Sequence, residues 1–535
     1  MTWYHKDLAT TKVYGINTQN AYKFLESKGL KPKTVIVAVL DSGVEVDHPG
    51  LKNNIWTNPN EIPNNGKDDD NNGYIDDVHG WNFLGGKNGD VDVDNLEVTR
   101  IIRKYKPIFE GENSVSNKAN QSKMPEEFDM YMQAKLDFSK KSIEAKQNFE
   151  VYKRINDAIP SIIAMLNGKN LTKENINAIQ PTTQEQAIGQ QLLLQISEDP
   201  AVKGKSPKEV QAFLQDQMKE ALDYFAPQAK QYDLDFDPRS IVGDNYDNLD
   251  EKNYGNNHYE GPEALHGTHV AGIIAGYPQG KEVQYGIASK VAKIMSVRTV
   301  PNGDERDKDV DNAIRYAVNN GAKVINMSFG KSFSPDKKQV WSAFQYAEDK
   351  GVLLVHAAGN DNQDIETNAN FPTNFYKQSD EKPFVNNVIT VGASTNKSDN
   401  LRAGFSNYNK KMVDVFAPGE KIYSTVIDGK YKYEQGTSMA SPVVAGAAAV
   451  LLAYMPTLTP EEVIESLVNT ANKSNVDAHI SSDASAKFDN ISRAGGVIDL
   501  KKAAEYAYNK FYKNNNTTTP VKASAPKMNK RKVKK

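Results

Sequence analysis

The chain is predicted to have an α/β fold: a doubly wound, mostly parallel sheet with helices on both faces, together with a large all-helical insertion. Two observations predict the sheet. Residues 34–40, TVIVAVL, form a continuous β-branched run, which is typical of a strand buried on both faces. Between 292 and 394, strand-like and helix-like segments alternate, as they do around a parallel sheet. A third observation, Lys-, Glu-, Gln- and Ala-rich segments with apolar residues at helical spacing between 126 and 225, predicts the insertion.

The composition narrows the class of protein. A chain of 535 residues exceeds the usual size of one domain, and 39% hydrophobic with 25% charged residues is typical of a soluble globular protein. No stretch approaches the roughly 20 apolar residues of a membrane span. A net charge of −3 gives no reason to expect a nucleic-acid partner, and the absence of cysteine excludes disulfides and thiol catalysis.

The first strand leads into a candidate functional residue. A short helix is expected around 18–28, followed by the strand at 34–40 and then by Asp41. Ligands and catalytic groups lie beyond the carboxyl ends of parallel strands. An aspartate after a strand is usually a turn or a helix cap, but Asp41, with Ser42 and Gly43 behind it, is better placed to orient a histidine.

The next segment, NGKDDDNNGYIDD at 65–77, resembles the first half of a calcium loop, in which oxygen ligands recur at every second position. The position of the last glutamate of an EF-hand holds His79, so the loop is not a complete EF-hand. The alternative is an acidic surface turn, but alternating carboxylates repel each other without a cation, which favours structural Ca²⁺. The expected ligands are Asp68, Asp70, Asn72, Tyr74, Asp76 and Asp77.

Residues 92–257 are predicted to be a helical insertion of five or so helices with no recognisable chemistry. A packing or lid element is the simplest interpretation. Its ends join the chain after the loop that follows Asp41 and just before His266, so it is expected to overhang the functional site or lie beside it. The helical segments are expected at 126–155, 157–167, 172–179, 183–196 and 206–225.

The second half contains a buried helix with a serine at its entrance. GTSMASPVVAG at 436–446 runs directly into the apolar segment 447–455. Ser438 therefore faces backbone N–H groups that have no partner in the first helical turn, which suits an oxygen that becomes negative during acyl transfer. Alternatively, Thr437, Ser438 or Ser441 is only a helix N-cap. Further strands are expected at 292–300, 322–330, 352–360 and 387–394, and helices at 266–277, 307–321, 336–351, 458–471 and 496–511.

Three motifs in order carry a family resemblance: LDSGVEVDHP at 40–49, HGTHVAG at 266–272 and GTSMASPVVAG. They supply Asp41, His266 and Ser438 in the order Asp, His, Ser, which is the order found in subtilisin. With the AAGN segment that ends at Asn360, the chain resembles the subtilisin-like serine proteases over about 34–90 and 260–510.

The resemblance implies a serine endopeptidase that acts on protein or peptide substrates through an acyl-enzyme. Asp41, His266 and Ser438 would be the catalytic triad, and Asn360 would bind the oxyanion. The segment Ser328, Phe329 and Gly330 would pair with the substrate backbone and form one wall of the primary pocket. No organic cofactor is expected, and nothing indicates the oligomeric state. The alternative is a non-catalytic binding or scaffold protein on a protease fold.

The expected domains follow from these motifs. The start, MTWYHKDL, lacks the apolar core of a signal peptide, and 40 residues before Asp41 are too few for the family's frequent pro-domain. A mature secreted or cell-envelope form is therefore expected, with a cytoplasmic protein as the alternative. The boundaries are 1–91 for the first part of the catalytic domain with the calcium loop, 92–257 for the insertion, 258–512 for the remaining catalytic domain and 513–535 for a disordered, Lys-rich tail.

Overall fold

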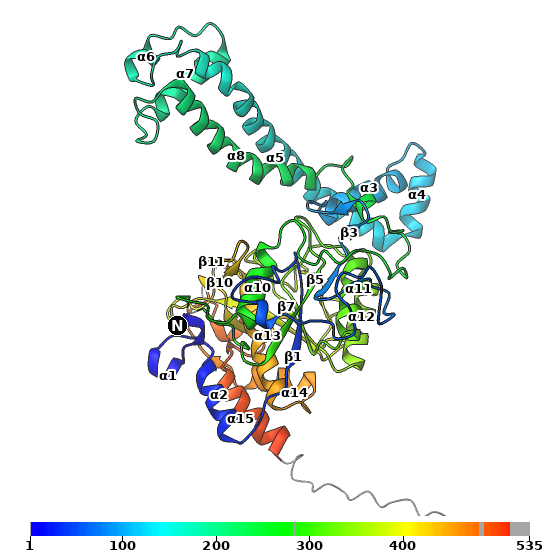
Figure 1. Ribbon diagram of the computed structural model, residues 1–535. Helices are drawn as coiled ribbons and strands as arrows, with labels where there is room; N and C mark the ends of the chain where they lie inside the picture. The colour runs from blue at the N-terminus through cyan, green and yellow to red at the C-terminus, as the bar shows by residue number, and fades with distance from the viewer. Residues whose placement is uncertain (1, 283, 481–485, 514–535) are drawn as a thin grey trace, which may run out of the picture.

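The computed structural model in Figure 1 describes residues 2–282, 284–480 and 486–513. It consists of an α/β body and a helical arm that projects from it. The predicted Lys-rich tail lies outside the described residues, apart from Lys513.

Within the described residues, nine strands form one sheet in the order β12-β13-β9-β8-β7-β6-β1-β5-β2. Within this sheet, as far as the structure describes it, neighbouring strands are parallel except for β12 and β13, which are antiparallel. The mostly parallel sheet expected from the sequence is therefore present. The bounds are β1 Val35–Asp41, β2 Gly80–Asn82, β5 Ala292–Arg298, β6 Val324–Met327, β7 Leu353–Ala357, β8 Val388–Ser394, β9 Val415–Pro418, β12 Asn472–Lys473 and β13 Gly496–Val497.

Helices cover both faces of this sheet. Side chains alternate along β1, so Val37 and Val39 join one apolar cluster while Ala38 and Leu40 join another on the opposite face. The first cluster includes side chains of α2 (Thr18–Ser27), α10 (Leu265–Ala275), α13 (Thr437–Tyr454), α14 (Pro460–Asn469) and α15 (Leu500–Ala507). The second includes side chains of α11 (Asp307–Asn319) and α12 (Lys337–Asp349). The arrangement is doubly wound, as predicted.

In the described part of the chain, the central helix α13 is long and apolar enough to cross a membrane, judged by its length and composition alone. However, 89% of this 18-residue segment is buried inside the protein, as expected of a core helix. The smaller elements are η1 Trp3–His5, α1 Leu8–Thr11, η2 Lys52–Asn54, β3 Gly85–Gly86, β4 Gly89–Asp90, β10 Ile422–Val426, β11 Lys430–Glu434, η3 Phe488–Asn490 and η4 Tyr508–Tyr512.

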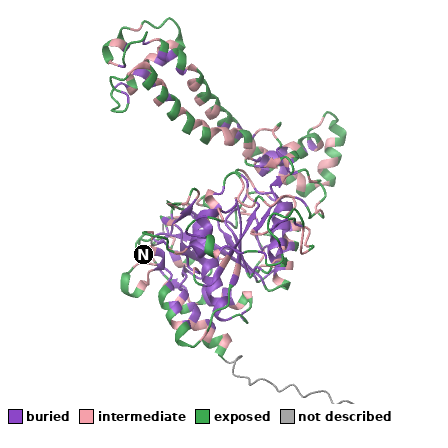
Figure 2. Ribbon diagram, in the orientation of Figure 1, coloured by how far each residue is buried: buried purple, intermediate pink, exposed green. Residues whose placement is uncertain are grey.

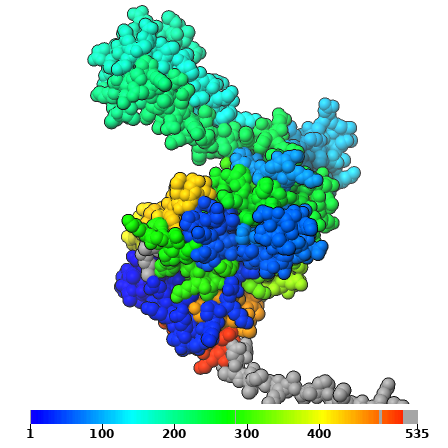
Figure 3. All heavy atoms as spheres, viewed as in Figure 1, coloured from blue at the N-terminus to red at the C-terminus, as the bar shows by residue number. Residues whose placement is uncertain are grey.

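The arm is a hairpin of two long helices, α5 (Pro125–Ala164) and α8 (Pro207–Gln231), with α6 (Lys173–Asn177) and α7 (Gln184–Ile196) at its tip. At 1.5 Å per residue, the 40 residues of α5 span about 60 Å. Figures 2 and 3 show that the middle of the hairpin is largely exposed and extends well beyond the body. The base contains α3 (Glu97–Phe109) and α4 (Ser114–Lys123), and α9 (Arg239–Val242) follows the arm.

Two expectations for the arm are wrong. The helices predicted at 126–155 and 157–167 are one helix, which continues through Pro160. Ile159, Ile162 and Ile163 around that proline are buried in an apolar cluster at the tip, and this packing keeps the helix continuous. In addition, α3 and α4 form where the sequence pattern indicated no helix.

Buried ion pairs join the base of the arm to the body. Arg306 Nε donates to Asp94 Oδ2 at 2.7 Å, and Arg239 Nη1 donates to Asp309 Oδ2 at 2.7 Å. Lys331, which follows the predicted substrate segment, donates from Nζ to Glu97 Oε2 at 2.6 Å. A cavity of about 160 Å³ lies between Asp137 and Lys141 of α5 and the segment that contains Gly330. The base of the arm therefore lies beside the predicted functional site.

Candidate active site

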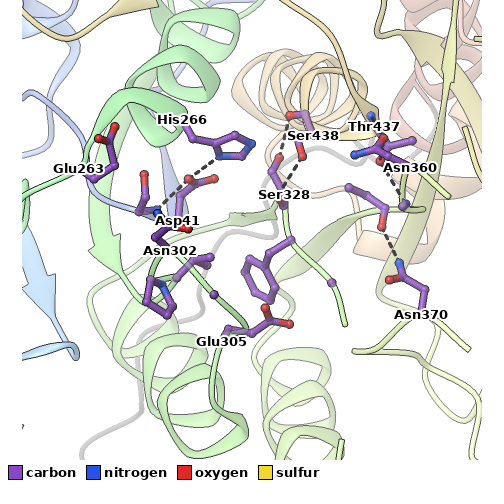
Figure 4. Close-up of a pocket in the computed structure, with 18 of the residues that line it drawn as sticks. Asp41, Glu263, His266, Asn302, Glu305, Ser328, Asn360, Asn370, Thr437 and Ser438 are labelled. Carbon is purple, nitrogen blue, oxygen red and sulfur yellow. Dashed lines mark hydrogen bonds and ion pairs between the residues drawn. The ribbon is translucent and has the colours of Figure 1, made fainter. Parts of the chain in front are cut away.

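The predicted site residues come together at the carboxyl edge of the sheet. Asp41 ends β1, Ser328 directly follows β6, and Asn360 follows β7 by a short loop. These three strands are neighbours in the sheet, so their ends meet. His266 comes from the first turn of α10 and Ser438 from the first turn of α13. All five line one cavity of about 470 Å³, which Figure 4 shows.

Asp41 and His266 are hydrogen-bonded directly. Asp41 is 1% exposed, and its Oδ1 lies 2.7 Å from Nδ1 of His266. The backbone N–H of Ser42 donates to the same oxygen at 2.7 Å, which holds the carboxylate in place. Burial alone would lower the pKa of His266. The negative charge of Asp41 and the hydrogen bond between Asp41 and His266 outweigh this effect and raise the pKa of His266. The imidazole is therefore oriented and made more basic by a buried carboxylate.

Ser438 lies at the start of α13, after Gly436. The φ of Gly436 is 152°, a conformation that L side chains rarely adopt, and this glycine permits the turn into the helix. Ser438 Oγ donates to the carbonyl of Ser328 at 3.1 Å, and Ser328 Oγ donates back to the carbonyl of Ser438 at 2.9 Å. In the residues that the structure describes, Ser438 makes no hydrogen bond to His266, although Figure 4 shows His266 between Asp41 and Ser438.

Asn360 is fixed by the residue that precedes the serine. Its Oδ1 accepts hydrogen bonds from the backbone N–H of Thr437 at 2.8 Å and from Thr437 Oγ1 at 3.0 Å. This orientation directs the carbonyl oxygen of the amide at Thr437 and leaves Nδ2 as a donor for the cavity. The backbone N–H of Ser438 belongs to the first helical turn and has no intrahelical acceptor. Two donors of different origin are thus available beside the Ser438 hydroxyl.

The segment Ser328–Gly330 forms another wall of the cavity. His356 Nε2 lies 2.9 Å from the carbonyl oxygen of Phe329, so that carbonyl points into the protein. The carbonyl of Ser328, in contrast, is on the cavity side, where it accepts from Ser438 Oγ. A Cβ on Gly330 would lie 2.4 Å from Asn370 Oδ1, so only glycine fits there without displacing Asn370.

The structure divides the six predicted calcium ligands into three groups. Asp70 and Asp77 lie together with Glu61, and carboxylate oxygens of these three residues are within 4.8 Å of one another. Asp68 and Asp76 instead accept hydrogen bonds from backbone N–H groups of the loop. The amide of Asn72 donates to Asp70 and Asp77, and the ring of Tyr74 is buried in an aromatic cluster.

Glu61 is a member of this cluster that the sequence interpretation missed. It is 7% exposed, and its Oε2 is buried without a hydrogen-bond partner in the described residues. Burial raises the pKa of Glu61, and burial also raises the pKa of Asp77 to about 6. These three carboxyl groups are partly removed from water and repel one another, and one of their oxygens has no hydrogen-bond partner in the described residues. Such a group of oxygens is suited to bind a cation. No spacing rule marks Glu61, because it precedes the loop motif.

A model of the subtilase family (Peptidase_S8) matches residues 32–486. The chain is 40% identical over 212 residues to a thermophilic serine proteinase of Bacillus sp. (strain AK1), a match that covers 39% of this chain and 45% of that protein. It is 38% identical over 209 residues to thermitase of Thermoactinomyces vulgaris, which covers 39% of this chain and 67% of thermitase.

A solved structure is also similar. The crystal structure of a cold adapted subtilisin-like serine proteinase is 36% identical, with a TM-score of 0.34, and the match covers 43% of this chain and 74% of that one. The chain spans less than half the length of the Bacillus proteinase that it matches. The family model, in contrast, extends from just before β1 to beyond α14 and includes the strands and helices that carry the five cavity residues. The chain therefore belongs to the subtilase family.

Proposed function

We propose that the protein is a serine endopeptidase that hydrolyses peptide bonds in proteins and peptides through an acyl-enzyme. The observation that carries the proposal is the 2.7 Å contact between Asp41 and His266 in the cavity that also holds Ser438. Ser438 Oγ attacks the substrate carbonyl while His266 Nε2 takes its proton and then delivers it to the leaving amine. Asp41 holds the tautomer and stabilises the imidazolium. Water then hydrolyses the ester by the same route in reverse.

The surrounding groups support the same reaction. Nδ2 of Asn360 and the backbone N–H of Ser438 would stabilise the negative oxygen of the tetrahedral intermediate. The backbone of Ser328 and Gly330 would bind an extended substrate as an additional strand. The Ser438 hydroxyl turns from the Ser328 carbonyl to His266 when substrate binds, since catalytic hydrogen bonds often form only in the substrate complex.

A fluorophosphonate probe tests the proposal directly, because it reacts with a serine only where a base and an oxyanion site activate it. Stoichiometric labelling of Ser438, identified by peptide mass spectrometry, is the expected result. A folded sample that is not labelled at Ser438 would support the non-catalytic scaffold instead.

Activity is expected to fall as the pH is lowered. The pKa of His266 is raised above its ordinary 6.5, so the ring becomes protonated, and lost as a base, already above pH 6.5. The measurement is kcat/KM for a fluorogenic peptide from about pH 9 to about pH 5. In Asp41→Asn, the residual activity should fall only at a lower pH than in the wild type, because the charge that raises the pKa of His266 is absent. An unchanged pH dependence in that variant would contradict the role of Asp41.

We also propose that the loop at 65–77 binds structural Ca²⁺. Glu61, Asp70 and Asp77 would hold the ion, which would satisfy the buried Oε2 of Glu61 and offset the repulsion among the three carboxylates. Asp68 and Asp76 would shape the loop through their hydrogen bonds to backbone N–H groups rather than bind the ion themselves.

Calcium is therefore expected to raise the thermal unfolding midpoint relative to excess chelator. An ion that binds only the folded state contributes about 2.7 kcal/mol when present at 100 times its Kd. The calcium-dependent shift should disappear in Glu61→Gln. It should persist in the control Asp68→Asn, which loses only backbone contacts. A wild-type midpoint that does not respond to chelator, or a shift that survives in Glu61→Gln, would reject this site.

We propose that the protein is secreted or located in the cell envelope. The support is that similar proteins include an extracellular serine proteinase of Thermus sp. (strain Rt41A) and a cell wall-associated protease of Bacillus subtilis (strain 168).

A further inference from the structure

Glu305 is a buried acidic residue in the wall of the active-site cavity, and one oxygen of its carboxyl group has no hydrogen-bond partner in the described residues. It is 2% exposed and lines the same cavity as Ser438. Its Oε1 is buried without a hydrogen-bond partner in the described residues. The backbone carbonyl of Glu305, in contrast, accepts from Lys331 Nζ at 2.9 Å and from Arg100 Nη2 at 3.2 Å. The backbone is therefore held firmly, while Oε1 of the carboxyl group has no hydrogen-bond donor among the described residues.

The nearby cations are already engaged by other acids. Lys331 Nζ contacts Glu97 at 2.6 Å and Asp307 at 2.9 Å. Arg100 Nη2 contacts Glu97 at 2.7 Å. Burial raises the pKa of Glu305 even though Lys331 is near, and the neighbouring Asp304 raises it further. Burying a carboxyl oxygen without a hydrogen-bond donor destabilises the folded protein, so Glu305 is not explained by a contribution to stability.

The rest of the cavity is also acidic. Besides Glu305, its lining includes Asp41, Glu263 and Asp361, against Arg298 and His266. The guanidinium of Arg298 is occupied by oxygens of Ser42, Asn82 and Val91. The cavity therefore has an excess of negative charge and attracts a cationic group.

The position of Glu305 suits a substrate side chain. Figure 4 shows Glu305 far from Ser438, beyond Ser328 and on the same side as Asn302. Gly330 lies in the same wall and is followed by Lys331, which contacts the Glu305 carbonyl. An extended substrate that starts at Ser438 and pairs with Ser328 and Gly330 would pass this carboxylate within a few residues of the scissile bond, at about 3.3 Å per residue.

We infer that Glu305 selects a lysine or arginine side chain at one substrate position on the acyl side of the scissile bond, between the second and the fourth residue from it. The inference rests on the proposed peptidase function for its context. The ammonium or guanidinium group enters the cavity and supplies the hydrogen-bond donor that Oε1 lacks. A charge-assisted hydrogen bond of this kind corresponds to about 10- to 150-fold in affinity.

The test uses fluorogenic peptides with leucine at the cleaved residue and either lysine or norleucine at the second, third or fourth position. Norleucine has nearly the same length without the charge. In the wild-type protein, lysine is expected to exceed norleucine by at least about tenfold in kcat/KM at one of the three positions. A ratio near one at all three positions would overturn the inference without any variant.

Glu305→Gln is the matched variant, and its lysine-to-norleucine ratio is expected to fall to about one. Glu305→Met, which replaces the carboxyl group with an apolar group of similar length, is a second variant should the first not fold. Glu263→Gln is the control, because this exposed acid lines the same cavity but is screened by solvent. Its ratio should stay within about threefold of the wild type. A preference that survives in both Glu305 variants places the selectivity elsewhere.

Binding separates this inference from the proposed function. Fluorescence anisotropy of the same peptides, dye-labelled, is measured on Ser438→Ala protein with Glu305 intact and with Glu305→Gln. A lysine preference that depends on Glu305 supports the inference even if the wild-type protein hydrolyses nothing, in which case only the proposed function fails. Hydrolysis by the wild type with no lysine preference in binding overturns the inference alone.

Discussion

Ser438→Ala is expected to reduce the kcat for casein or peptide hydrolysis by about 10⁶-fold, the loss that follows removal of the nucleophile from a subtilisin. The effect is so large because the variant lacks the hydroxyl that forms the acyl-enzyme. Stability should change little, because the variant loses only the 3.1 Å hydrogen bond from Ser438 Oγ to the Ser328 carbonyl, about 1 kcal/mol. Hydrolysis rates and the thermal unfolding midpoint are the two measurements.

Ser441→Ala is the control for the serine variant. Ser441 is on the same helix, is fully buried and donates from Oγ to Asn326 Oδ1 at 2.7 Å. Its loss leaves Asn326 without that donor and should destabilise the protein by about 1–3 kcal/mol while most of the activity remains. Peptide hydrolysis at the wild-type rate by purified Ser438→Ala would falsify the proposed mechanism.

Lys331→Met is expected to destabilise the protein by about 3–5 kcal/mol, because it leaves two buried carboxylates without their shared cation. Lys331 is 5% exposed and contacts Glu97, from the base of the arm, and Asp307, from α11. Burial alone would raise the pKa of Glu97, but Arg100 and Lys331 outweigh it and lower the pKa to about 2. The stabilisation from Glu97 is therefore present above its unfolded pKa of 4.5 and is lost as the pH falls toward 2.

Tryptophan fluorescence in urea provides the measurement. The four tryptophans, Trp3, Trp56, Trp81 and Trp341, all lie outside the arm, so the signal reports the body. The Ser438→Ala background prevents self-digestion. The control is Lys430→Met, whose pair with Asp428 is 70% exposed on both sides and contributes at most about 1 kcal/mol. If Lys331→Met costs no more than Lys430→Met, then the buried pairs do not join the arm to the body as argued.

The ion pairs around Lys331 determine which part of the arm can be deleted without destabilising the body. A linker that replaces the helices after Phe109 keeps Glu97 and Arg100. A deletion that begins at residue 92 removes Glu97, which pairs with Lys331, and Arg100, which pairs with Glu97. The pattern of polar and apolar residues indicated a helical insertion with no chemistry, and it contained no sign that one of its first helices is paired with the residue after Gly330. Sequence separation hides the pair, because Glu97 and Lys331 are 234 residues apart.

The sequence by itself determined the features that depend on short-range patterns. The β-branched run before Asp41, the small residues around Ser438 and the alternation from 292 to 394 each specify local structure through sterics and burial, and each element formed where it was expected. The strand before Asp41 was enough to place this residue at the carboxyl edge of a parallel sheet, and the order of the three motifs added His266 and Ser438 through the family resemblance.

Only the tertiary structure decided which carboxylates meet one another and which keep an oxygen without a hydrogen-bond donor. Glu61 joins Asp70 and Asp77 because the loop folds back on itself, and Oε1 of Glu305 has no hydrogen-bond partner in the described residues because Lys331 and Arg100 bind other acids. Pro160 stays inside a helix because the tip of the arm packs around it. These outcomes depend on distances between residues far apart in the chain, and burial and Coulomb energies, unlike local propensities, are set by those distances.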